Sequence, residues 1–465
     1  MMRIILPSTF SLLLATNSLV ANAQIKPNII LIYSDDHGWA DLGAQGVNGD
    51  IHTPNLDKMA AEGIRFTHGY TSAPQSVPSR AGVLTGRYQQ RFGVEENGMG
   101  PLPLTELTIS ERLKEVGYVS CQVGKWHLGT TSKVNGKRKK QDSESTELDV
   151  TTNFRPKDQG FDEYYCGALH TFQASHDLHG YKLTEENSQI KDHRFRCIWQ
   201  ADAGVQFINR HTSAPFFLYL AFFAPHVPLE SPEPWFSQTD KNLPLKRRKA
   251  LAMIAAMDDG IGKIRETLRE QGLDKNTLIF FVGDNGAPLR NAWNGSINLP
   301  LVGEKGMLTD GGIRTPFLAV WPGMLPAGKV EHRAVSTLDV AATAVSIAGL
   351  KNKKNLDGVD LIPYLQVGNT EPIHDALYWR WRSQAAILMP PYKLIRLGPT
   401  EKYLFDTTTP EGEKETKNCI TQYPKIAEQL EKKLMEWSAS LPFPGLPRAK
   451  NDADERFYNE YVKGK

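Results

Sequence analysis

Four strand-like runs along the chain each end in polar residues that can carry chemistry. The runs cover residues 28–33, 118–123, 216–223 and 277–282. Largely apolar runs of this length, without strict alternation, are typical of strands that a parallel sheet buries on both faces. Sheets of this class bind ligands beyond the carboxyl ends of their strands. The pattern therefore predicts an α/β fold whose functional site gathers the residues that follow these runs.

Amphipathic segments between the runs predict helices that cover the sheet. Thr53 is a residue type that caps helix N-termini, and residues 54–62 after it have helical periodicity. Residues 245–270 form a longer amphipathic segment, which also predicts a helix. Within it, Asp258 and Asp259 are interpreted as solvated or ion-paired side chains rather than as catalytic acids.

Beyond about residue 369 the pattern changes to short strands followed by one helix. The strands are expected over 376–381, 385–388, 392–396 and 402–405, and the helix over 426–437. This order predicts an α+β subdomain, a small antiparallel sheet packed with one helix. The first strand interleaves aromatics and cations, which favours a strand edge and leaves a sugar subsite as the alternative; these residues are Trp379, Arg380, Trp381 and Arg382.

The first residues of the chain are typical of a secretory signal peptide. Arg3 supplies a positive charge, an apolar stretch follows, and Ala21 to Ala23 form an Ala-x-Ala cleavage site. A membrane anchor is the alternative, but polar residues break the apolar stretch. We therefore expect cleavage after Ala23 and export to the periplasm or the extracellular space. The division expected is a signal peptide at 1–23, the main α/β domain at 24–368 and the subdomain at 369–465.

Composition and charge narrow the classes of partner. Hydrophobic residues make up 40% of the 465-residue chain and charged residues 23%, which is typical of a globular protein with a large core. The formal net charge of +2 gives no electrostatic bias toward nucleic acid, so none is expected as a partner. No stretch after the signal is long and apolar enough to predict a membrane span.

Cysteine and histidine spacing matches no zinc pattern. The four cysteines are Cys121, Cys166, Cys197 and Cys419. A Cys166–Cys197 disulfide is conceivable in an oxidising compartment, and buried free thiols are the alternative. Residues 131–158 are polar and aperiodic and are interpreted as a surface insertion near the site. Four histidines nearby are interpreted as loop residues, with substrate contact by one of them as the alternative; they are His170, His176, His179 and His193.

Acidic and amide residues at two of the strand ends suit a hard metal ion. Asp35 and Asp36 follow the first run, and Asp284 and Asn285 follow the last. Carboxylate and amide oxygens are ligands that Ca²⁺ or Mg²⁺ takes in preference to a soft metal. The sequence therefore predicts an oxygen-ligated cation at this edge of the sheet.

Residues 76–86 predict a helix start that suits an anion. Pro78 fits the first turn, and Arg80 lies about one turn beyond Ser76 on the same face. Exposed backbone N–H groups and the positive end of the helix dipole favour a negative charge there. Taken alone, the segment indicates no more than the start of a helix.

Together with other segments, however, this helix start resembles the signature of the formylglycine-dependent sulfatases, in the Ser-type, arylsulfatase-like branch of the alkaline phosphatase-like superfamily. The signature residues are Ser76, Pro78, Ser79, Arg80, Thr85 and Gly86. The other matching segments are Asp-Asp-His-Gly at 35–38, Gly-Lys-Trp-His-Leu-Gly at 124–129, Pro-His-x-Pro at 225–228, Gly-Asp-Asn-Gly at 283–286 and Gly-Glu-Lys-Gly at 303–306. Their common order over most of the chain makes chance a poor explanation. The resemblance implies a large mixed, mostly parallel sheet between helices, with a smaller C-terminal antiparallel sheet.

The resemblance also implies a role for each site residue. A maturation enzyme oxidises Ser76 to formylglycine (3-oxoalanine), whose hydrate carries two hydroxyl groups. The residues implied to bind a metal ion, Ca²⁺ ahead of Mg²⁺, are Asp35, Asp36, Asp284, Asn285 and the modified Ser76. The residues implied to act on the sulfate group are Ser76, Arg80, Lys125, His127, His226 and Lys305.

The reaction implied by the resemblance has two steps. One hydroxyl of the hydrate attacks sulfur in line, and His226 protonates the departing alcohol as general acid. His127 then removes the proton of the other hydroxyl, so that sulfate leaves and the aldehyde returns. An unmodified Ser76 would instead be trapped as a stable sulfate ester, because it has no second hydroxyl to expel sulfate.

The expected substrate is a sulfated carbohydrate, such as a polysaccharide, a glycosaminoglycan or a mucin-type glycan. Two other functions stay open at this point. One is a phosphodiesterase or phosphonate-ester hydrolase of the same superfamily, although the segments at 124–129 and 225–228 favour sulfate. The other is a sulfated-glycan binding protein in which Ser76 stays unmodified.

Overall fold

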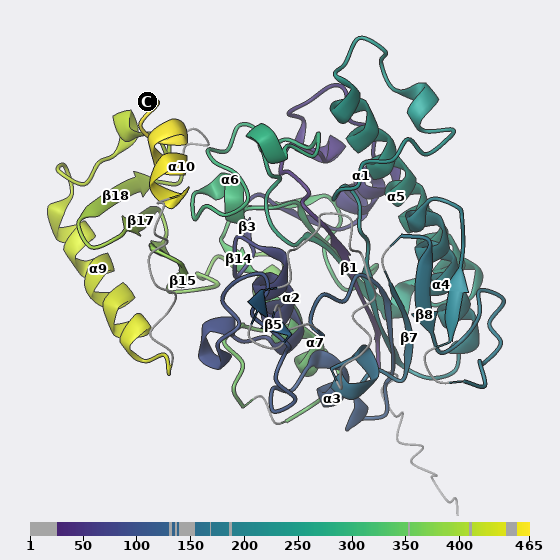
Figure 1. Ribbon diagram of the computed structural model, residues 1–465. Coiled ribbons are helices and arrows are strands. Elements are labelled where there is room, and N and C mark those ends of the chain that lie inside the picture. The colour runs from purple at the N-terminus through teal and green to yellow at the C-terminus, as the bar shows by residue number, and fades with distance from the viewer. Residues whose placement is uncertain are drawn as a thin grey trace, which may run out of the picture.

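The computed structural model in Figure 1 describes residues 26–129, 133–134, 137–138, 154–167, 169–185, 188–351, 354–408, 412–442 and 453–465. The predicted signal peptide lies outside the described residues, and so does most of the predicted insertion at 131–158. Two short strands inside that insertion, β5 (Lys133–Val134) and β6 (Lys137–Arg138), form an antiparallel pair.

A ten-stranded mixed sheet lies at the centre of the main unit. Its order is β13 (Lys329–Glu331), β2 (Ile64–Phe66), β12 (Phe317–Val320), β11 (Thr277–Gly283), β1 (Asn28–Ser34), β10 (Phe216–Ala221), β4 (Val119–Gly124), β7 (Glu163–Gly167), β8 (Thr171–Ala174) and β9 (Gln189–Lys191). The central strands β11, β1, β10 and β4 are parallel, together with the adjoining β7, and β12 and β8 pair antiparallel on either side of this group. This sheet confirms the predicted α/β class.

The four predicted runs form those four central strands. Tyr33 near the end of β1 lies beside Ala221 of β10 and Val282 of β11, and Ala221 lies beside Gly124 of β4. The strands therefore end side by side, and the segments that follow them emerge at one edge of the sheet.

Helices cover both faces of the sheet (Figure 1). One layer contains α1 (Pro54–Glu62), α4 (Arg196–Arg210) and α5 (Leu245–Glu270), and the other contains α2 (Ser76–Thr85), α3 (Ile109–Lys114) and α7 (Leu338–Ile347). Every residue of β1 is buried, because successive side chains enter one core or the other. This double burial explains why the run is apolar throughout rather than alternating.

The C-terminal region forms the predicted smaller antiparallel sheet. Its strands follow chain order: β15 (Leu377–Trp381), β16 (Gln384–Met389), β17 (Tyr392–Leu397) and β18 (Glu401–Asp406). Helix α9 (Pro424–Ala439) packs on one face and α10 (Ala453–Tyr461) on the other. Four short strands and α-helices lie outside the two larger sheets: β3 (Gly69–Tyr70), β14 (Val335–Ser336), α6 (Asp310–Ile313) and α8 (Ile362–Leu365). The domain boundary at residue 369 stays a prediction.

The cap of α1 differs from the prediction. The Thr53 side chain accepts no hydrogen bond from a backbone N–H of the helix, and its hydroxyl donates to the carboxylate of Asp57 at 3.1 Å instead. The carboxylate of Asp258, from α5, accepts the backbone N–H groups of Asn55 and Leu56 at 2.9 and 2.8 Å. The prediction that Asp258 is solvated or ion-paired was wrong, because this side chain is fully buried and caps a neighbouring helix.

The aromatic and cationic residues of β15 lie at a sheet edge, as predicted, but their aromatic rings do not line a sugar subsite. Trp379 and Trp381 are 2% and 1% exposed and belong to the core of the subdomain. Arg380 is also buried and forms an ion pair with Glu95 at 2.6 Å. These three side chains therefore serve packing within the protein.

None of the four cysteines is joined to another by a disulfide. The conceivable disulfide between Cys166 and Cys197 is therefore absent, and the alternative of buried thiols holds for Cys121 and Cys197. Among the helices of the described segments, none combines the length and apolar character that crossing a membrane requires.

Candidate active site

Helix α2 presents Ser76 at its first turn toward the strand ends. The helix begins at Ser76 and ends at Gly86, whose φ of 67° places it in the left-handed region that glycine adopts without strain. All ten residues of α2 are buried, so this is an internal helix start. The Ser76 hydroxyl donates to Asp35 Oδ1 at 3.2 Å and lies 3.3 Å from Asn285 Oδ1.

Three carboxylates from two strand ends meet in front of this helix start. Asp35, Asp36 and Asp284 are 0%, 2% and 0% exposed. The backbone N–H of Asp36 donates to Asp284 Oδ1 at 3.0 Å, and Asn285 Nδ2 donates to Asp36 Oδ1 at 2.7 Å. These bonds hold Asp36 at a φ of 55°, a conformation that non-glycine residues adopt at some energetic cost.

Each carboxylate has a cation of its own. Arg80 Nη2 lies 2.9 Å from Asp284 Oδ2, and Lys125 Nζ lies 2.5 Å from Asp35 Oδ2. Lys305 Nζ lies 2.6 Å from Asp36 Oδ1. Burying isolated charges is strongly unfavourable, so three buried carboxylates can persist together only because cations accompany them.

The pKa values of these carboxyl groups reflect the crowding. Burial alone would raise the pKa of Asp35, but Lys125, His226 and the other cations hold it well below its ordinary value. Burial and the charge of Asp35 raise the pKa of Asp284 to about 7. The three cations therefore leave the negative charge at Asp284 incompletely compensated.

Two histidines flank the cluster. His127 follows Lys125 at the end of β4 and has a φ of 60°, the second site residue in the left-handed region. Burial and the Lys125 charge lower the pKa of His127 well below its ordinary value. His226 Nε2 lies 3.6 Å from Asp36 Oδ2, while its Nδ1 lies 2.7 Å from the Val227 carbonyl oxygen. Because a carbonyl oxygen only accepts, Nδ1 carries a hydrogen atom.

The donor set at this edge fits a divalent cation. Asp35, Asp36 and His226 each offer an atom within 4.8 Å of the others, which makes them a candidate metal-binding triad. Asn285 Oδ1 lies next to the same group, 3.3 Å from Ser76 Oγ. Burial and the charge of Asp35 raise the pKa of Asp284, and a cation bound next to its carboxylate would favour the ionised form.

The structure brings together every residue that the sequence predicted for the site. They are Asp35, Asp36, Ser76, Arg80, Lys125, His127, His226, Asp284, Asn285 and Lys305. Proximity alone does not test the individual roles, which stay predictions.

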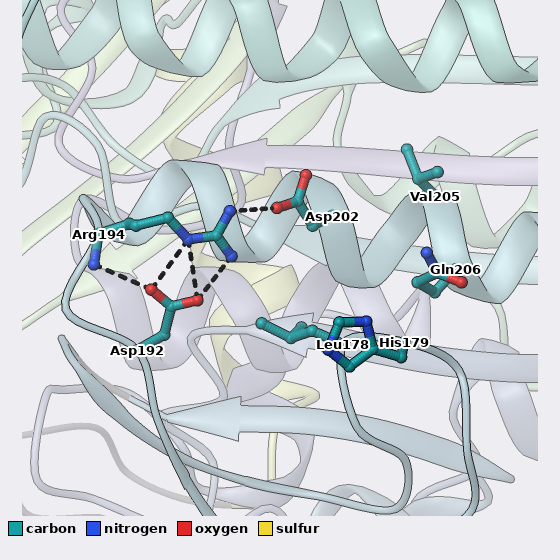
Figure 2. Close-up of a pocket in the computed structure, with 7 residues that line it drawn as sticks. All are labelled: Leu178, His179, Asp192, Arg194, Asp202, Val205 and Gln206. Carbon is teal, nitrogen blue, oxygen red and sulfur yellow. Dashed lines mark hydrogen bonds and ion pairs between the residues drawn. The ribbon is translucent and has the colours of Figure 1, made fainter.

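The four scattered histidines lie outside this cluster. His176 Nδ1 lies 3.5 Å from Glu163, and His170 Nε2 lies 3.8 Å from Glu230. His179 lines a separate cavity of about 410 Å³ on the outer side of α4, shown in Figure 2. The guanidinium of Arg194 in that cavity already pairs with Asp192 and Asp202 at 2.6 and 2.7 Å, so the cavity offers no uncompensated cation for a sulfate group.

Sequence reasoning missed three residues that hold the site together. Tyr219 of β10 lies 3.2 Å from Arg80 Nη1. Asn294 Nδ2 donates to the carbonyl oxygens of Asp36 and Pro225 at 3.0 and 3.3 Å. Arg196, the first residue of α4, bonds to the loop that carries His226. No local pattern marks these residues, because each contacts segments that are distant in the sequence.

Comparison with known families agrees with the site. Residues 27–350 match the family model of the sulfatases, and residues 303–440 match that of the C-terminal part of N-sulphoglucosamine sulphohydrolase. N-acetylgalactosamine-6-sulfatase of Canis lupus familiaris is 33% identical over 405 residues, which cover 80% of this chain and 72% of that protein.

Solved structures are similar over nearly the whole chain. The crystal structure of Ps i-CgsB in complex with k-i-k-neocarrahexaose is 29% identical with a TM-score of 0.77, and covers 93% of this chain and 97% of its own. The phosphonate monoester hydrolase SpPMH of Silicibacter pomeroyi, at 18% identity and a TM-score of 0.67, covers 90% of this chain and 96% of its own. At that identity the second similarity concerns the fold alone.

Proposed function

The chain belongs to the sulfatase family and is a sulfuric ester hydrolase, and on that premise we propose that it is an exported enzyme that removes sulfate from a carbohydrate. The observation that carries the proposal is the cluster at the strand ends, where three buried carboxylates, the buried cations Arg80 and Lys125 and the half-buried Lys305 lie around the helix start at Ser76. Export is supported by the signal-peptide pattern that ends at Ala23.

Ser76 is converted to formylglycine in this proposal. Its hydroxyl is buried and lies between Asp35 and Asn285, which supports a role at the centre of the site. The hydrated aldehyde supplies two hydroxyl groups, one to attack sulfur and one whose deprotonation permits release of sulfate. The unmodified serine has only one, so the modification accounts for turnover.

Asp35, Asp36, Asp284 and Asn285 hold a Ca²⁺ ion. Their oxygen atoms form the hard donor set that Ca²⁺ prefers, and a cation is favoured where burial leaves Asp284 with a raised pKa. When bound, the ion adds positive charge next to the sulfate oxygens. Ca²⁺ is preferred to Mg²⁺ because Ca²⁺ accepts many protein oxygen ligands in a flexible geometry, whereas Mg²⁺ usually keeps several waters.

The cations and the two histidines handle charge and protons. Arg80, Lys125 and Lys305 surround the position next to Ser76 and share the negative charge of the transferring group. His226 presents Nε2 toward the cluster, since its Nδ1–H donates to the Val227 carbonyl oxygen. Burial lowers the pKa of His226 while the charges of Asp35 and Asp36 oppose this, and it is the doubly protonated ring, with a second hydrogen on Nε2, that donates this hydrogen to the departing alcohol. His127, whose pKa is lowered, is neutral at ordinary pH and accepts the proton of the second hydroxyl.

The substrate class is a sulfated galactose- or hexosamine-containing glycan. The relative named N-acetylgalactosamine-6-sulfatase and the Ps i-CgsB complex with k-i-k-neocarrahexaose both support a carbohydrate. Which sugar and which sulfate position are bound depends on the residues around the entrance rather than on the cluster.

The test of this function begins with the chemistry of Ser76. We expect the tryptic peptide Phe66–Arg80 of the protein secreted by its own host to weigh two hydrogens less than its unmodified sequence. The same preparation should release sulfate from sulfated galactose or hexosamine, and chelation of Ca²⁺ should stop that release. An intact serine in a host that matures other sulfatases would refute the mechanism. Hydrolysis of phosphate or phosphonate esters in place of sulfate esters would favour the phosphoesterase alternative.

A further inference from the structure

Arg196 is a buried cation whose polar contacts converge on one loop, residues 225–230. It is the first residue of α4, and its side chain is 0% exposed. Its Nη2 donates to the carbonyl oxygens of His226 and Pro228 at 2.7 and 2.9 Å. Its Nε lies 3.5 Å from Glu230 Oε1, in the same loop. Burying a guanidinium group costs free energy unless hydrogen bonds and charged partners replace the hydration that it loses.

The loop depends on side chains from elsewhere for its anchoring. Pro225 and Pro228 have no backbone N–H, so neither can donate a hydrogen bond to the neighbouring segments. Arg196 binds the carbonyl groups on both sides of Val227, and Asn294 binds that of Pro225. The backbone of this loop is therefore held mainly through its carbonyl oxygens.

The orientation of the His226 ring follows from that backbone. Its Nδ1–H donates to the Val227 carbonyl oxygen, the one that lies between the two carbonyls bound by Arg196. Fixing the peptides on either side fixes the Val227 carbonyl, and that carbonyl directs the ring so that Nε2 faces the cluster, 3.6 Å from Asp36 Oδ2. A rotated ring would carry Nε2 away from the departing alcohol.

We propose that Arg196 is a positioning residue for the reaction, which acts through the carbonyl groups of His226 and Pro228 to orient the His226 imidazole. Because its side chain is fully buried, this role requires no contact with the sulfate group or the sugar. The inference rests on the proposed function, specifically on protonation of the departing alcohol by His226.

The test compares Arg196→Met with wild-type protein that carries formylglycine, on two substrates. One is the sulfated monosaccharide that wild type hydrolyses fastest, and the other is 4-nitrophenyl sulfate, whose leaving group needs little protonation. We expect kcat on the sugar sulfate to fall by roughly 10²-fold with little change in KM, since general acids contribute about that much, and kcat on the aryl sulfate to fall far less. The ratio of the two rates, measured on one preparation, does not depend on how much protein is folded.

A double-mutant cycle gives a second readout. In a His226→Ala background, Arg196→Met should lower the sugar sulfate rate little further, because the residue it positions is gone. Arg196→Lys should recover part of the loss, since an ammonium group can still donate to one carbonyl. Arg210→Met, at the far end of α4 where Arg210 pairs with Glu163, is the matched control and should leave the ratio of rates unchanged.

The outcomes separate this inference from the proposed function. Equal losses on both substrates, or an undiminished further loss in the His226→Ala background, would mean that Arg196 only stabilises the fold. A formylglycine-containing wild type that releases sulfate from neither substrate would instead refute the proposed function itself. If Arg196→Met does not fold, Arg196→Lys is measured by the same ratio.

Discussion

At the scale of single residues, the site is a set of buried charges that depend on one another. Each of the carboxylates Asp35, Asp36 and Asp284 lies against a different cation. Asp36 and His127 also adopt left-handed backbone conformations, and such strain persists only where neighbouring contacts enforce it. A change to one member therefore leaves its partner charged and unpaired in a poorly solvated space.

Lys305 offers the clearest test at this scale. Lys305→Met removes the cation that bonds both oxygens of Asp36, at 2.6 and 2.9 Å. We expect kcat/KM for a sulfate ester to fall by roughly 10²–10³-fold, since a cation that stabilises the transferring group is lost. The control is Lys329→Met, which removes a lysine paired with Glu331 at 3.1 Å on β13, outside the cluster. Comparable activity in the two variants would contradict the role given to Lys305.

At the scale of elements, helices determine the positions of the groups that do chemistry. Helix α2 begins at Ser76, and α4 begins at Arg196 next to the loop of His226. On the same layer as α4, α5 supplies the carboxylate of Asp258 that caps α1. One helix thus completes the N-terminal hydrogen bonds of another, which ties the layer together.

Removing the Asp258 cap should lower the stability of the fold without changing the activity of the site. Asp258→Ala leaves the N–H groups of Asn55 and Leu56 without their acceptor, which should destabilise the fold by about 1–3 kcal/mol. A thermal melt should show a lower Tm, while kcat per folded molecule should stay unchanged. Asp259→Ala, at the exposed neighbouring position, is the control and should shift the Tm less. If Asp258→Ala lowers kcat although all of the protein is folded, the contacts of Asp258 also affect the active site.

At the scale of the whole molecule, the C-terminal sheet holds the turn that carries Lys305. Gln384 of β16 bonds the carbonyl oxygen of Gly306 and the N–H of Leu308, both at 2.9 Å, on the turn that carries Lys305. Lys393 of β17, fully buried, lies 2.8 Å from both Asp310 of α6 and Glu413. The two units are therefore joined by buried polar bonds as well as by apolar packing.

Glu413 in this junction should make the stability of the fold depend on pH. Burial and the neighbouring charge of Asp310 raise the pKa of Glu413 from 4.5 to about 7. A carboxyl group whose pKa is raised on folding stabilises the fold while it is protonated, and this stabilisation is lost as pH rises through the folded pKa. The Tm of the wild type should therefore fall between about pH 4.5 and about pH 7, and Glu413→Gln should reduce that fall.

The control for this pH effect is Glu415→Gln, an exposed position close by in the chain. It should keep the wild-type dependence. Equal pH dependence in wild type and Glu413→Gln would show that Glu413 is ionised throughout this range.

The sequence by itself determined the central strands and the helix start at Ser76, and it predicted the residues that the fold brings together at the strand ends. The apolar runs predicted β1, β4, β10 and β11 to within two residues at each end. This succeeds because double burial and helix initiation leave local patterns, and because the residues that carry the chemistry directly follow those patterns.

The tertiary structure alone decided which residues support the site and which serve the core. Asn294 bridges Asp36 and Pro225, partners 258 and 69 residues away, and no local pattern encodes such a contact. Trp379 carried a pattern that allowed a sugar subsite, yet its burial is decided by α10 and the facing strands. Patterns record the periodicity of a segment, whereas the partner that a side chain meets is fixed only when distant segments pack together.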